Sequence, residues 1–268
     1  ALDALLSGRQ PEVYRPYEDR LTAKVQGKLL QYFDIMSEGK RQSQRDKETI
    51  QGLVSDISHQ VKTPIANIRM FAGILRQHQL SPEKQAQFLA TMEGQIDKLE
   101  FLMQSLIKMS RMETGTFTLH MEEARLADTV AQAMSTVWAR AEAKGIALAA
   151  DCDSRITVQH DPKWTAEAFG NILDNAIKYT PSGGSVSVSV RPWQFYTRVD
   201  ITDTGIGIPE EHYNDVFQRF YRAPEAAAQE GVGLGLYLAN GIVTRQKGYI
   251  SVKSKPGQGT TFSVYLLS

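Results

Sequence analysis

The first part of the chain carries apolar residues at the spacing of helices that pack against other helices. Val25, Leu29, Tyr32 and Met36 follow one another at steps of 4, 3 and 4 residues, which is the seam spacing of a coiled helix. Residues 37–49 interrupt the seam with mixed charge. We interpret this interval as a solvated stretch of the same helix, the alternative being a hinge.

The seam resumes at Ile50 and continues to about Arg76, where a turn leads to a second long helix. Ser81 is a suitable N-cap, and Pro82 occupies the first helical position. This helix should end near Gly115. Its apolar seam comprises Phe88, Leu89, Met92, Ile96, Leu99, Leu102, Met103, Leu106 and Met109. Because a lone hairpin cannot bury two such stripes well, the pattern predicts a homodimer with a four-helix bundle.

After residue 115 the pattern changes to short strands that alternate with helices. Helices are predicted at residues 126–144 and 163–179, and a third follows Gly235. Strands are predicted at residues 117–121, 146–152, 156–159, 185–190, 196–201, 249–254 and 260–266. This alternation predicts an α/β sandwich, with helices packed on one face of a mixed sheet.

Length and hydrophobic pattern together predict a multidomain protein with an α part and an α+β part, since 268 residues are enough for two domains. Residues 1–20 contain two prolines and little periodicity, so they are interpreted as a connector. The predicted segments are residues 1–46, with the connector and the coiled helix, residues 47–115, with the helical hairpin, and residues 116–268, with the sandwich.

Charge and cysteine content narrow the possible partners and compartment. Lysine and arginine total 30, as do aspartate and glutamate, so no global field favours nucleic acid or an anionic membrane. The single cysteine, Cys152, excludes an intrachain disulfide and fits the reducing cytosol, where we expect it to be buried. No run of 18 apolar residues is present, so we expect no membrane span and no secretion leader in this piece.

One histidine stands on the polar side of the first helix. At about 100° per residue, the apolar side chains that precede and follow it form one stripe, and His59 lies roughly 180° from Ile50. Thr63 is one turn further on, and Pro64 removes the amide that would bond to Gln60, which should loosen or kink the helix. The stripe comprises Ile50, Leu53, Val54, Ile57 and Val61. An exposed nucleophile follows, although a surface histidine alone needs no function.

Two stretches in the second half of the chain carry polar groups that could bind a ligand. Asn171, Asn175 and Lys178 share one helix face at i, i+4 and i+7. Amide oxygens there could bind Mg²⁺, and the ammonium could bind phosphate; a solvated helix face is the plainer alternative. Asp203 ends a predicted strand before a Gly-x-Gly turn at Gly205. This carboxylate could accept the exocyclic amine of a purine, or it could belong to an ordinary turn.

Glycines mark two further stretches. Gly231, Gly233 and Gly235 precede an apolar helix, where free amides can bind phosphate oxygens. The run is not a dinucleotide fingerprint, because no strand directly precedes it. Thr260 follows a Gly-x-Gly turn that leads into the last strand. Residues 223–230 have poor periodicity and are predicted to form a lid over a nucleotide.

In this order, the stretches resemble the sensor histidine kinases of bacterial two-component systems, over about residues 47–268. The family joins a dimerisation and histidine phosphotransfer hairpin to an ATP-binding domain of the Bergerat fold, which gyrase, Hsp90 and MutL share. The resemblance assigns the hairpin to residues 47–115 and the ATP-binding domain to residues 116–268. It implies ATP and Mg²⁺ as cofactors, and a homodimer and the receiver domain of a response regulator as partners.

The resemblance also implies roles for individual residues. His59 would be the phosphoacceptor, and Asn171 and Asn175 would form the N-box, with Asn175 on Mg²⁺. Lys178 would contact phosphate and Tyr179 the base. The remaining nucleotide contacts would be Asp203 to adenine, Gly205 and Gly207 in the first glycine box, Phe217 and Phe220 in the F-box, Arg222 toward the γ-phosphate, Gly231, Gly233 and Gly235 in the second glycine box, and Thr260.

The implied reaction is autophosphorylation of His59 and transfer of the phosphoryl group to an aspartate of the regulator. Thr63 would orient water to remove that group again, which makes the protein a phosphatase as well. Members usually carry an acidic residue where this chain has Gln60, so a nucleotide-binding pseudokinase is one alternative. A gyrase-type ATPase is the other, disfavoured by Asn171 where hydrolytic members have glutamate. The resemblance places this segment in the cytosol, behind a membrane-anchored sensor.

Overall fold

The computed structural model describes residues 20–77, 80–113, 117–226, 229 and 231–268. Before residue 51 it describes the side chains of Lys28, Gln31 and Glu38 only. The chain divides into two compact units, Ala1–Thr63 and Pro64–Ser268, and each is described by itself. The predicted connector and the seam from Val25 to Met36 therefore lie outside the described residues or side chains. The division at residues 46 and 115 stays a prediction.

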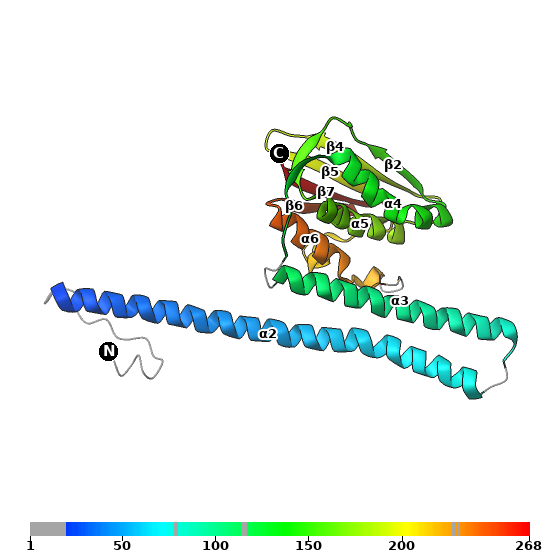
Figure 1. The fold of residues 1–268 in the computed structure, drawn as a ribbon, viewed down its shortest axis with the longest axis horizontal. Coiled ribbons are helices and arrows are strands. Elements are labelled where there is room, and N and C mark those ends of the chain that lie inside the picture. The colour runs from blue at the N-terminus through cyan, green and yellow to red at the C-terminus, as the bar shows by residue number, and fades with distance from the viewer. Residues whose placement is uncertain (1–19, 78–79, 114–116, 227–228, 230) are drawn as a thin grey trace. The chain divides into compact units, whose positions relative to one another are not determined.

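Helix α2, Arg20–Gln77, is a single helix of 58 residues (Figure 1). The charged interval at 37–49 does not interrupt it, which agrees with a solvated helical stretch. Pro64 lies inside the helix and does not end it, because the residues on both sides supply the remaining backbone hydrogen bonds. Leu53, Ile57 and Val61 of the predicted buried stripe are half-buried, and the side chain of Ile50 lies outside the described ones. Val54 is 57 % exposed, so its inclusion in the buried stripe was wrong: it lies at the edge of the stripe, which the single chain leaves uncovered.

Helix α3, Pro82–Glu113, begins at the predicted cap. The backbone N–H of Lys84 donates to Ser81 Oγ at 3.4 Å. The rings of Phe71 on α2 and Phe88 on α3 lie 5.2 Å apart between centroids. One side of α3 is buried in the single chain, and its buried residues are Leu102, Ser105, Met109 and Met112. The other side keeps its apolar residues in solvent, among them Leu89, Ile96 and Met103.

A five-stranded mixed sheet forms the centre of the C-terminal part, with the strand order β2-β4-β5-β7-β6. Strand β2 runs parallel to β4, and the other neighbours pair antiparallel. The strands are β2 Ala147–Asp151, β4 Ser185–Pro192, β5 Tyr196–Asp203, β7 Gly259–Leu267 and β6 Tyr249–Lys255. Each predicted strand of this sheet is found, with ends that differ by one or two residues.

Three helices cover one face of this sheet: α4 Leu126–Lys144, α5 Pro162–Tyr179 and α6 Gly235–Arg245 (Figure 1). Their apolar sides are buried against alternate residues of the strands; Ile172 on α5 and Val264 on β7 are both fully buried. Each such side chain contributes about 1.5–3 kcal/mol of burial free energy. Asp161 caps α5 by accepting the N–H of Trp164 at 3.0 Å. The predicted α/β sandwich is confirmed.

The strand predicted at residues 117–121 was wrong. The strand of this region is β1, Glu122–Arg125, which pairs antiparallel with β3, Thr157–His160. The segment before it is irregular because α5 supplies the contacts that a neighbouring strand would otherwise provide. The ring of Phe117 lies 4.4 Å from that of Trp164 between centroids, and the N–H of His120 donates to Asp161 Oδ2 at 2.8 Å.

Between β5 and α6 the chain forms three short 3-10 turns, η1 Glu210–His212, η2 Asp215–Phe217 and η3 Pro224–Ala226. Cys152 is half-buried rather than fully buried, since it follows directly after an edge strand. Burial first, and then the neighbouring carboxylates Asp153 and Asp151, raise the pKa of its thiol, which disfavours the reactive thiolate. Within the described part of the chain, no helix is long and apolar enough to cross a membrane.

Candidate functional site

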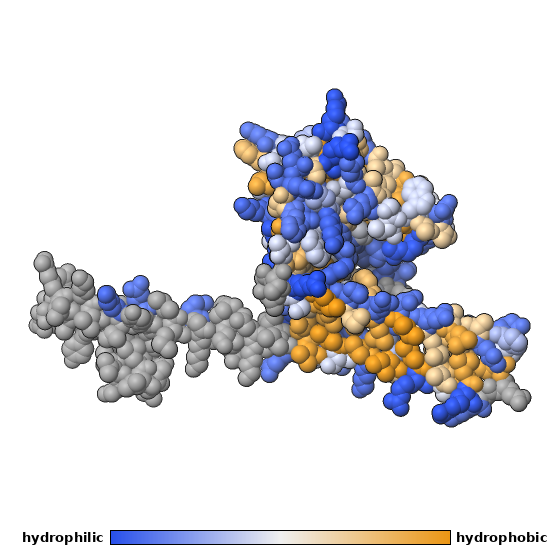
Figure 2. Space-filling model, in the orientation of Figure 1, coloured by the Kyte–Doolittle hydropathy of each residue, from blue (hydrophilic) through white to orange (hydrophobic). Residues whose placement is uncertain are grey.

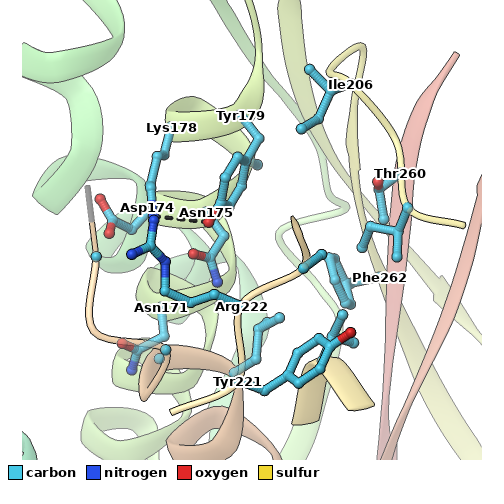
Figure 3. Close-up of a pocket in the computed structure, with 18 of the residues that line it drawn as sticks. Asn171, Asp174, Asn175, Lys178, Tyr179, Ile206, Tyr221, Arg222, Thr260 and Phe262 are labelled. Atoms are coloured by element: carbon cyan, nitrogen blue, oxygen red, sulfur yellow. Dashed lines mark hydrogen bonds between the residues drawn. The ribbon is translucent and has the colours of Figure 1, made fainter. Parts of the chain in front are cut away.

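A pocket opens in the C-terminal part between α5, the turn after β5, the loop before α6 and strand β7 (Figure 3). It gathers residues that are far apart in the sequence, from Phe101 to Phe262. Most of the residues predicted to contact a nucleotide lie on its wall. These are Asn171, Asn175, Lys178, Tyr179, Asp203, Gly207, Arg222, Gly231, Gly233, Gly235 and Thr260.

Asp203 is the buried acid of this pocket and is 6 % exposed. Its Oδ1 accepts the backbone N–H of Gly205 at 2.8 Å and that of Thr260 at 3.2 Å. Burial raises the pKa of Asp203, and these two N–H groups lower it in part. Both hydrogen bonds end on Oδ1, so Oδ2 is left to accept a hydrogen bond from a ligand. An exocyclic amine is a donor of the right kind.

The glycines of the first glycine box lie very close to Asp203 and to the backbone of neighbouring elements. Gly205 does not line the pocket, but a Cβ there would lie 2.7 Å from both Asp203 Oδ1 and the Tyr179 carbonyl oxygen. Gly207 has φ +73°, and a Cβ there would lie 2.2 Å from the carbonyl oxygen of Lys255. Glycine is therefore required at both positions by close backbone approach. The role of Gly205 is to orient the acid rather than to form the pocket wall.

Helix α5 contributes a polar face, as its spacing predicted. The Nδ2 of Asn171 donates to the carbonyl of Glu167 at 2.9 Å, which turns its Oδ1 toward Gly235, where a Cβ would lie 3.2 Å away. The Nζ of Lys178 donates to Tyr179 Oη at 2.8 Å (Figure 3). This ammonium also lies 4.5 Å from the centroid of the Tyr179 ring. The face presents amide oxygens and one cation to the pocket.

The donor set fits a magnesium ion that a bound nucleotide shares. Magnesium prefers hard oxygen ligands and commonly takes only one or two from the protein, the others coming from phosphate and water. Asn171 and Asn175 supply amide oxygens on the pocket wall. In the part of the chain that the structure describes, no cluster of three or more His, Cys, Asp and Glu residues could form a separate cage.

The second glycine box lies close to both α5 and the F-box. A Cβ at Gly231 would lie 2.4 Å from Lys178 Nζ. Gly233 has φ +77°, and a Cβ there would lie 2.6 Å from the carbonyl oxygen of Tyr221. Phe220 has φ +60° and donates its N–H to the carbonyl of Gly233 at 2.8 Å. Phe220 itself does not line the pocket, because its backbone supports the loop that does.

The other F-box residue, Phe217, also lies behind the pocket wall. Its ring packs edge-on against that of Phe262, with 6.2 Å between centroids, and Phe262 lines the pocket. The two F-box residues that were predicted to contact the nucleotide therefore do not line the pocket. They support Phe262 and Gly233, which are themselves at the wall.

On helix α2 the side chains of His59 and Thr63 are both exposed, as predicted from helical geometry. The hydroxyl of Thr63 donates to the carbonyl oxygen of His59 at 3.5 Å. That hydroxyl oxygen keeps its lone pairs for other donors, such as water. Gln60, the next residue after the histidine, is half-buried. The helix thus presents an accessible imidazole with a hydroxyl one turn away.

Two family models match the chain in the order of its parts. The model described as "His Kinase A (phospho-acceptor) domain" matches residues 49–115, and the one described as "Histidine kinase-, DNA gyrase B-, and HSP90-like ATPase" matches residues 160–268. Together they cover more than half of the chain. The chain belongs to the sensor histidine kinases of two-component systems. The predicted fold class is confirmed with it.

Individual histidine kinases resemble this one over most of its length. It is 31 % identical over 215 residues to the sensor-like histidine kinase SenX3 of Mycobacterium tuberculosis, which covers 80 % of this chain and 52 % of SenX3. It is 27 % identical over 214 residues to the sensor protein DivL of Caulobacter vibrioides, covering 80 % of this chain and 27 % of DivL. The chain therefore spans about half or less of these curated relatives.

Solved structures of histidine kinases share the fold. Acinetobacter baumannii AdeS superposes with a TM-score of 0.65 at 21 % identity, covering 78 % of this chain and 97 % of AdeS. ThkA, solved in complex with the response regulator protein TrrA, gives a TM-score of 0.69 at 19 % identity, with 83 % of this chain and 63 % of ThkA covered. At these identities the likeness shows the fold.

The sequence patterns missed several residues that line the pocket of this histidine kinase. Asp174 lies on the same helix face as Asn171, three residues on, and pairs with Arg140 of α4; its helical position alone could have indicated it. Ile206 lies between the two glycines of the first box, and Tyr221 directly precedes Arg222. The pattern gave these apolar and aromatic residues no distinguishing signal.

Proposed function

We propose that the protein is an ATP-dependent kinase that phosphorylates its own His59. In this reaction Nε2 of His59 attacks the γ-phosphorus of ATP, the bond from that phosphorus to the β,γ-bridging oxygen breaks, and ADP leaves with the electron pair. The observation that carries the proposal is the exposed imidazole of His59, in a segment that matches the phospho-acceptor family model. We retain residues 47–115 as the phosphotransfer domain and residues 116–268 as the ATP-binding domain.

The pocket contains candidate groups for the adenine, the phosphates and a magnesium ion. Buried Asp203 accepts the adenine amine through Oδ2, while its own N–H donors fix Oδ1. Lys178 and Arg222 are the cations of the pocket wall and bind the phosphates. Asn175, which lies on that wall and carries an amide oxygen, would hold Mg²⁺. When bound, this ion neutralises charge that develops on the phosphate oxygens.

An amide at position 171 explains why water does not receive the phosphoryl group. A general base at that point would remove a proton from an attacking water molecule. The Nδ2 of Asn171 instead donates to the Glu167 carbonyl, and the amide oxygen is too weak a base for this task. The γ-phosphoryl group is thereby conserved until an imidazole reaches it. This argues against the gyrase-type ATPase.

The phosphoryl group then passes to an aspartate of a response regulator, and Thr63 assists its later removal as phosphate. Support for such a partner comes from ThkA, which was solved with the response regulator protein TrrA. The Thr63 hydroxyl is exposed one turn after His59, where it can hold an attacking water. Replacing Thr63 by alanine should slow dephosphorylation of the regulator and leave labelling of His59 largely intact. A larger loss of labelling would make Thr63 a residue that supports the helix.

The helical hairpin supports a homodimer. Figure 2 shows apolar surface along the hairpin. Its apolar residues that are at least two-fifths exposed include Ile65, Met70, Leu89, Ile96 and Met103. A contiguous apolar face of this kind marks a protein interface. A second copy would cover it and complete a four-helix bundle. Since relatives are named sensor proteins and are longer than this chain, we place the segment in the cytosol behind a membrane-anchored sensor.

Labelling with γ-³²P-ATP tests the proposed reaction. A kinase of this type should give protein-bound label that acid removes and base does not, because a phosphoimidazole P–N bond hydrolyses in acid. Release of free phosphate without labelled protein would instead indicate an ATPase. Nucleotide binding with neither product would indicate a pseudokinase, the alternative that Gln60 beside His59 favours.

A further inference from the structure

We infer that His212 is a positioning residue for phosphoryl transfer, which acts through Tyr221 on the loop that carries Arg222. The inference rests on the proposed kinase function and goes beyond it, since His212 lies outside the pocket wall. It belongs to turn η1, whereas Tyr221 and Arg222 precede turn η3. The contact therefore links two separate loops around the nucleotide site.

The contact between the two residues is short and shielded. Tyr221 Oη lies 2.7 Å from His212 Nδ1, and the two ring centroids are 5.9 Å apart at an interplanar angle of 52°. The side chain of His212 is only 16 % exposed. Burial, followed by Asp215, Glu225 and Glu211, raises the pKa of Tyr221, so its hydroxyl stays protonated. The hydroxyl can therefore donate to Nδ1, and the groups that face the other ring nitrogen decide the direction of this hydrogen bond.

The opposite ring nitrogen of His212 faces two carboxylates. Its Nε2 lies 3.7 Å from Glu211 Oε1 and 3.9 Å from Glu225 Oε2. Because carboxylates only accept, the ring proton is assigned to Nε2, which faces these acids, and Nδ1 accepts from Tyr221 Oη. Glu225 is in turn η3, beyond Arg222. His212 therefore contacts the loop both before and after Arg222, which fixes the segment at two points.

Tyr221 transmits this position to the phosphate side of the pocket. A Cβ at Gly233 would lie 2.6 Å from the carbonyl oxygen of Tyr221, so the Tyr221 backbone packs directly on the second glycine box. Its neighbour Arg222 lines the pocket (Figure 3). The groups that receive the adenine, Asp203 and Thr260, are held by their own hydrogen bond to each other instead. Loss of the His212 contact should misplace the phosphate side and spare the adenine side.

This asymmetry predicts a change in kcat rather than in nucleotide affinity. Misplacing a positioned group by about 1 Å can cost roughly 100-fold in rate. His212→Ala removes contacts that help to position the loop of Arg222, so we expect a smaller effect, about a tenfold decrease in kcat for phosphohistidine formation. The KM for ATP and the Kd for ADP should stay within about threefold, because adenine binding supplies most of the shared ground-state affinity.

The experiment compares three substitutions with the unaltered chain. In His212→Asn the side-chain oxygen is bonded to Cγ, as Nδ1 is in histidine, and can still accept from Tyr221 Oη; this variant should recover most of the kcat. Tyr221→Phe removes the donor and should resemble His212→Ala. His120→Ala replaces an exposed histidine whose backbone N–H makes its only described contact, so it serves as the control. ADP-binding stoichiometry corrects each rate for misfolded protein.

A double substitution separates the contact from two independent effects. If the Tyr221–His212 contact carries the effect, His212→Ala with Tyr221→Phe should be no slower than either single variant. Multiplied losses, an unchanged kcat in His212→Ala, or a fall in ADP affinity equal to the fall in kcat would each overturn the inference. The proposed function fails by a different result, the absence of acid-labile label on the unaltered chain, so the two failures are distinguishable.

Discussion

The two chemically important regions of this kinase are built in opposite ways. His59 stands exposed on a long helix, and the Thr63 hydroxyl, one turn further on, donates to its carbonyl oxygen. Asp203 is buried at the end of a central strand and is fixed by N–H groups from a turn and from a distant strand. Under the proposed function, exposed His59 can take the phosphoryl group from ATP and pass it to a regulator, whereas fixed Asp203 suits recognition of the nucleotide.

This difference predicts that the two regions can be disabled independently. Replacing His59 by alanine should abolish protein labelling, with a loss of more than about 1000-fold, since no other group inherits the role of nucleophile. Binding of ADP should stay within about threefold, because the pocket residues all lie in the unit Pro64–Ser268. Labelling and isothermal titration measure the two effects. Label that persists in the variant would place the phosphoryl group on another residue.

Replacing Asp203 by asparagine should give the reverse result, weak nucleotide binding with an intact acceptor. Loss of a charged acceptor for the adenine amine should weaken ATP binding by roughly 10- to 100-fold. The effect should be smaller for a purine triphosphate without the amino group at C6. Asp200→Asn, the same change on the same strand at a carboxylate outside the pocket wall, is the matched control. Equal losses for both nucleotides would refute the assignment of Asp203 to the amine.

The same contrast explains what could be predicted from the sequence. The side of α2 on which His59 lies follows from a period of 3.6 residues, a local property, and the structure confirms its exposure. The pocket joins α5, β5 and β7, whose pairing of Asp203 with Thr260 is non-local. Motifs identified its polar residues, because carboxylates, amides and glycines have few reasons to occur at such spacings. They could not show that Phe217 and Phe220 stand behind the wall, or that Tyr221 meets His212.

Irregular segments were the least predictable. Residues 117–121 have the alternation of a strand, yet Phe117 packs on Trp164 and the N–H of His120 donates to Asp161 Oδ2. A tertiary contact to the start of α5 thus overrode the local preference. The correct strand, β1, carries the charged sequence Glu-Glu-Ala-Arg, which has no apolar alternation to detect.

Substitution of Gln60 should raise the rate of the reaction at His59 rather than abolish it. For Nε2 to attack, the ring proton must be on Nδ1, and a neighbouring carboxylate both fixes that tautomer and accepts the proton. The amide of Gln60 can do only the first. Gln60→Glu should therefore accelerate labelling by about 10- to 100-fold, and the gain should fall at low pH as the introduced carboxylate protonates, near the ordinary glutamate pKa of ~4.3. An unchanged rate between pH 5 and 9, at unchanged ATP affinity, would show that proton removal is not limiting.

The smallest expected effect concerns a buried histidine in the ATP-binding part, in contrast to exposed His59. His160 is fully buried; its Nδ1 lies 2.8 Å from the Val158 carbonyl oxygen, and its Nε2 lies 2.8 Å from Thr129 Oγ1. Since a carbonyl only accepts, Nδ1 carries the proton and the Thr129 hydroxyl donates to Nε2. Burial lowers the pKa of His160, although the hydrogen bond to Val158 opposes the shift.

The sign of the resulting pH dependence follows from proton binding. Between the lowered pKa of folded His160 and the value of about 6.5 for an unfolded histidine, the unfolded chain binds a proton that the folded chain does not. The free energy of unfolding should therefore decrease as pH falls below about 6.5 and level off below the folded pKa. Urea denaturation of the chain at several pH values measures this slope. His160→Gln, which does not titrate, should flatten it, whereas the exposed-site variant His120→Gln should leave it unchanged. Equal slopes in all three proteins would assign the pH dependence to other groups.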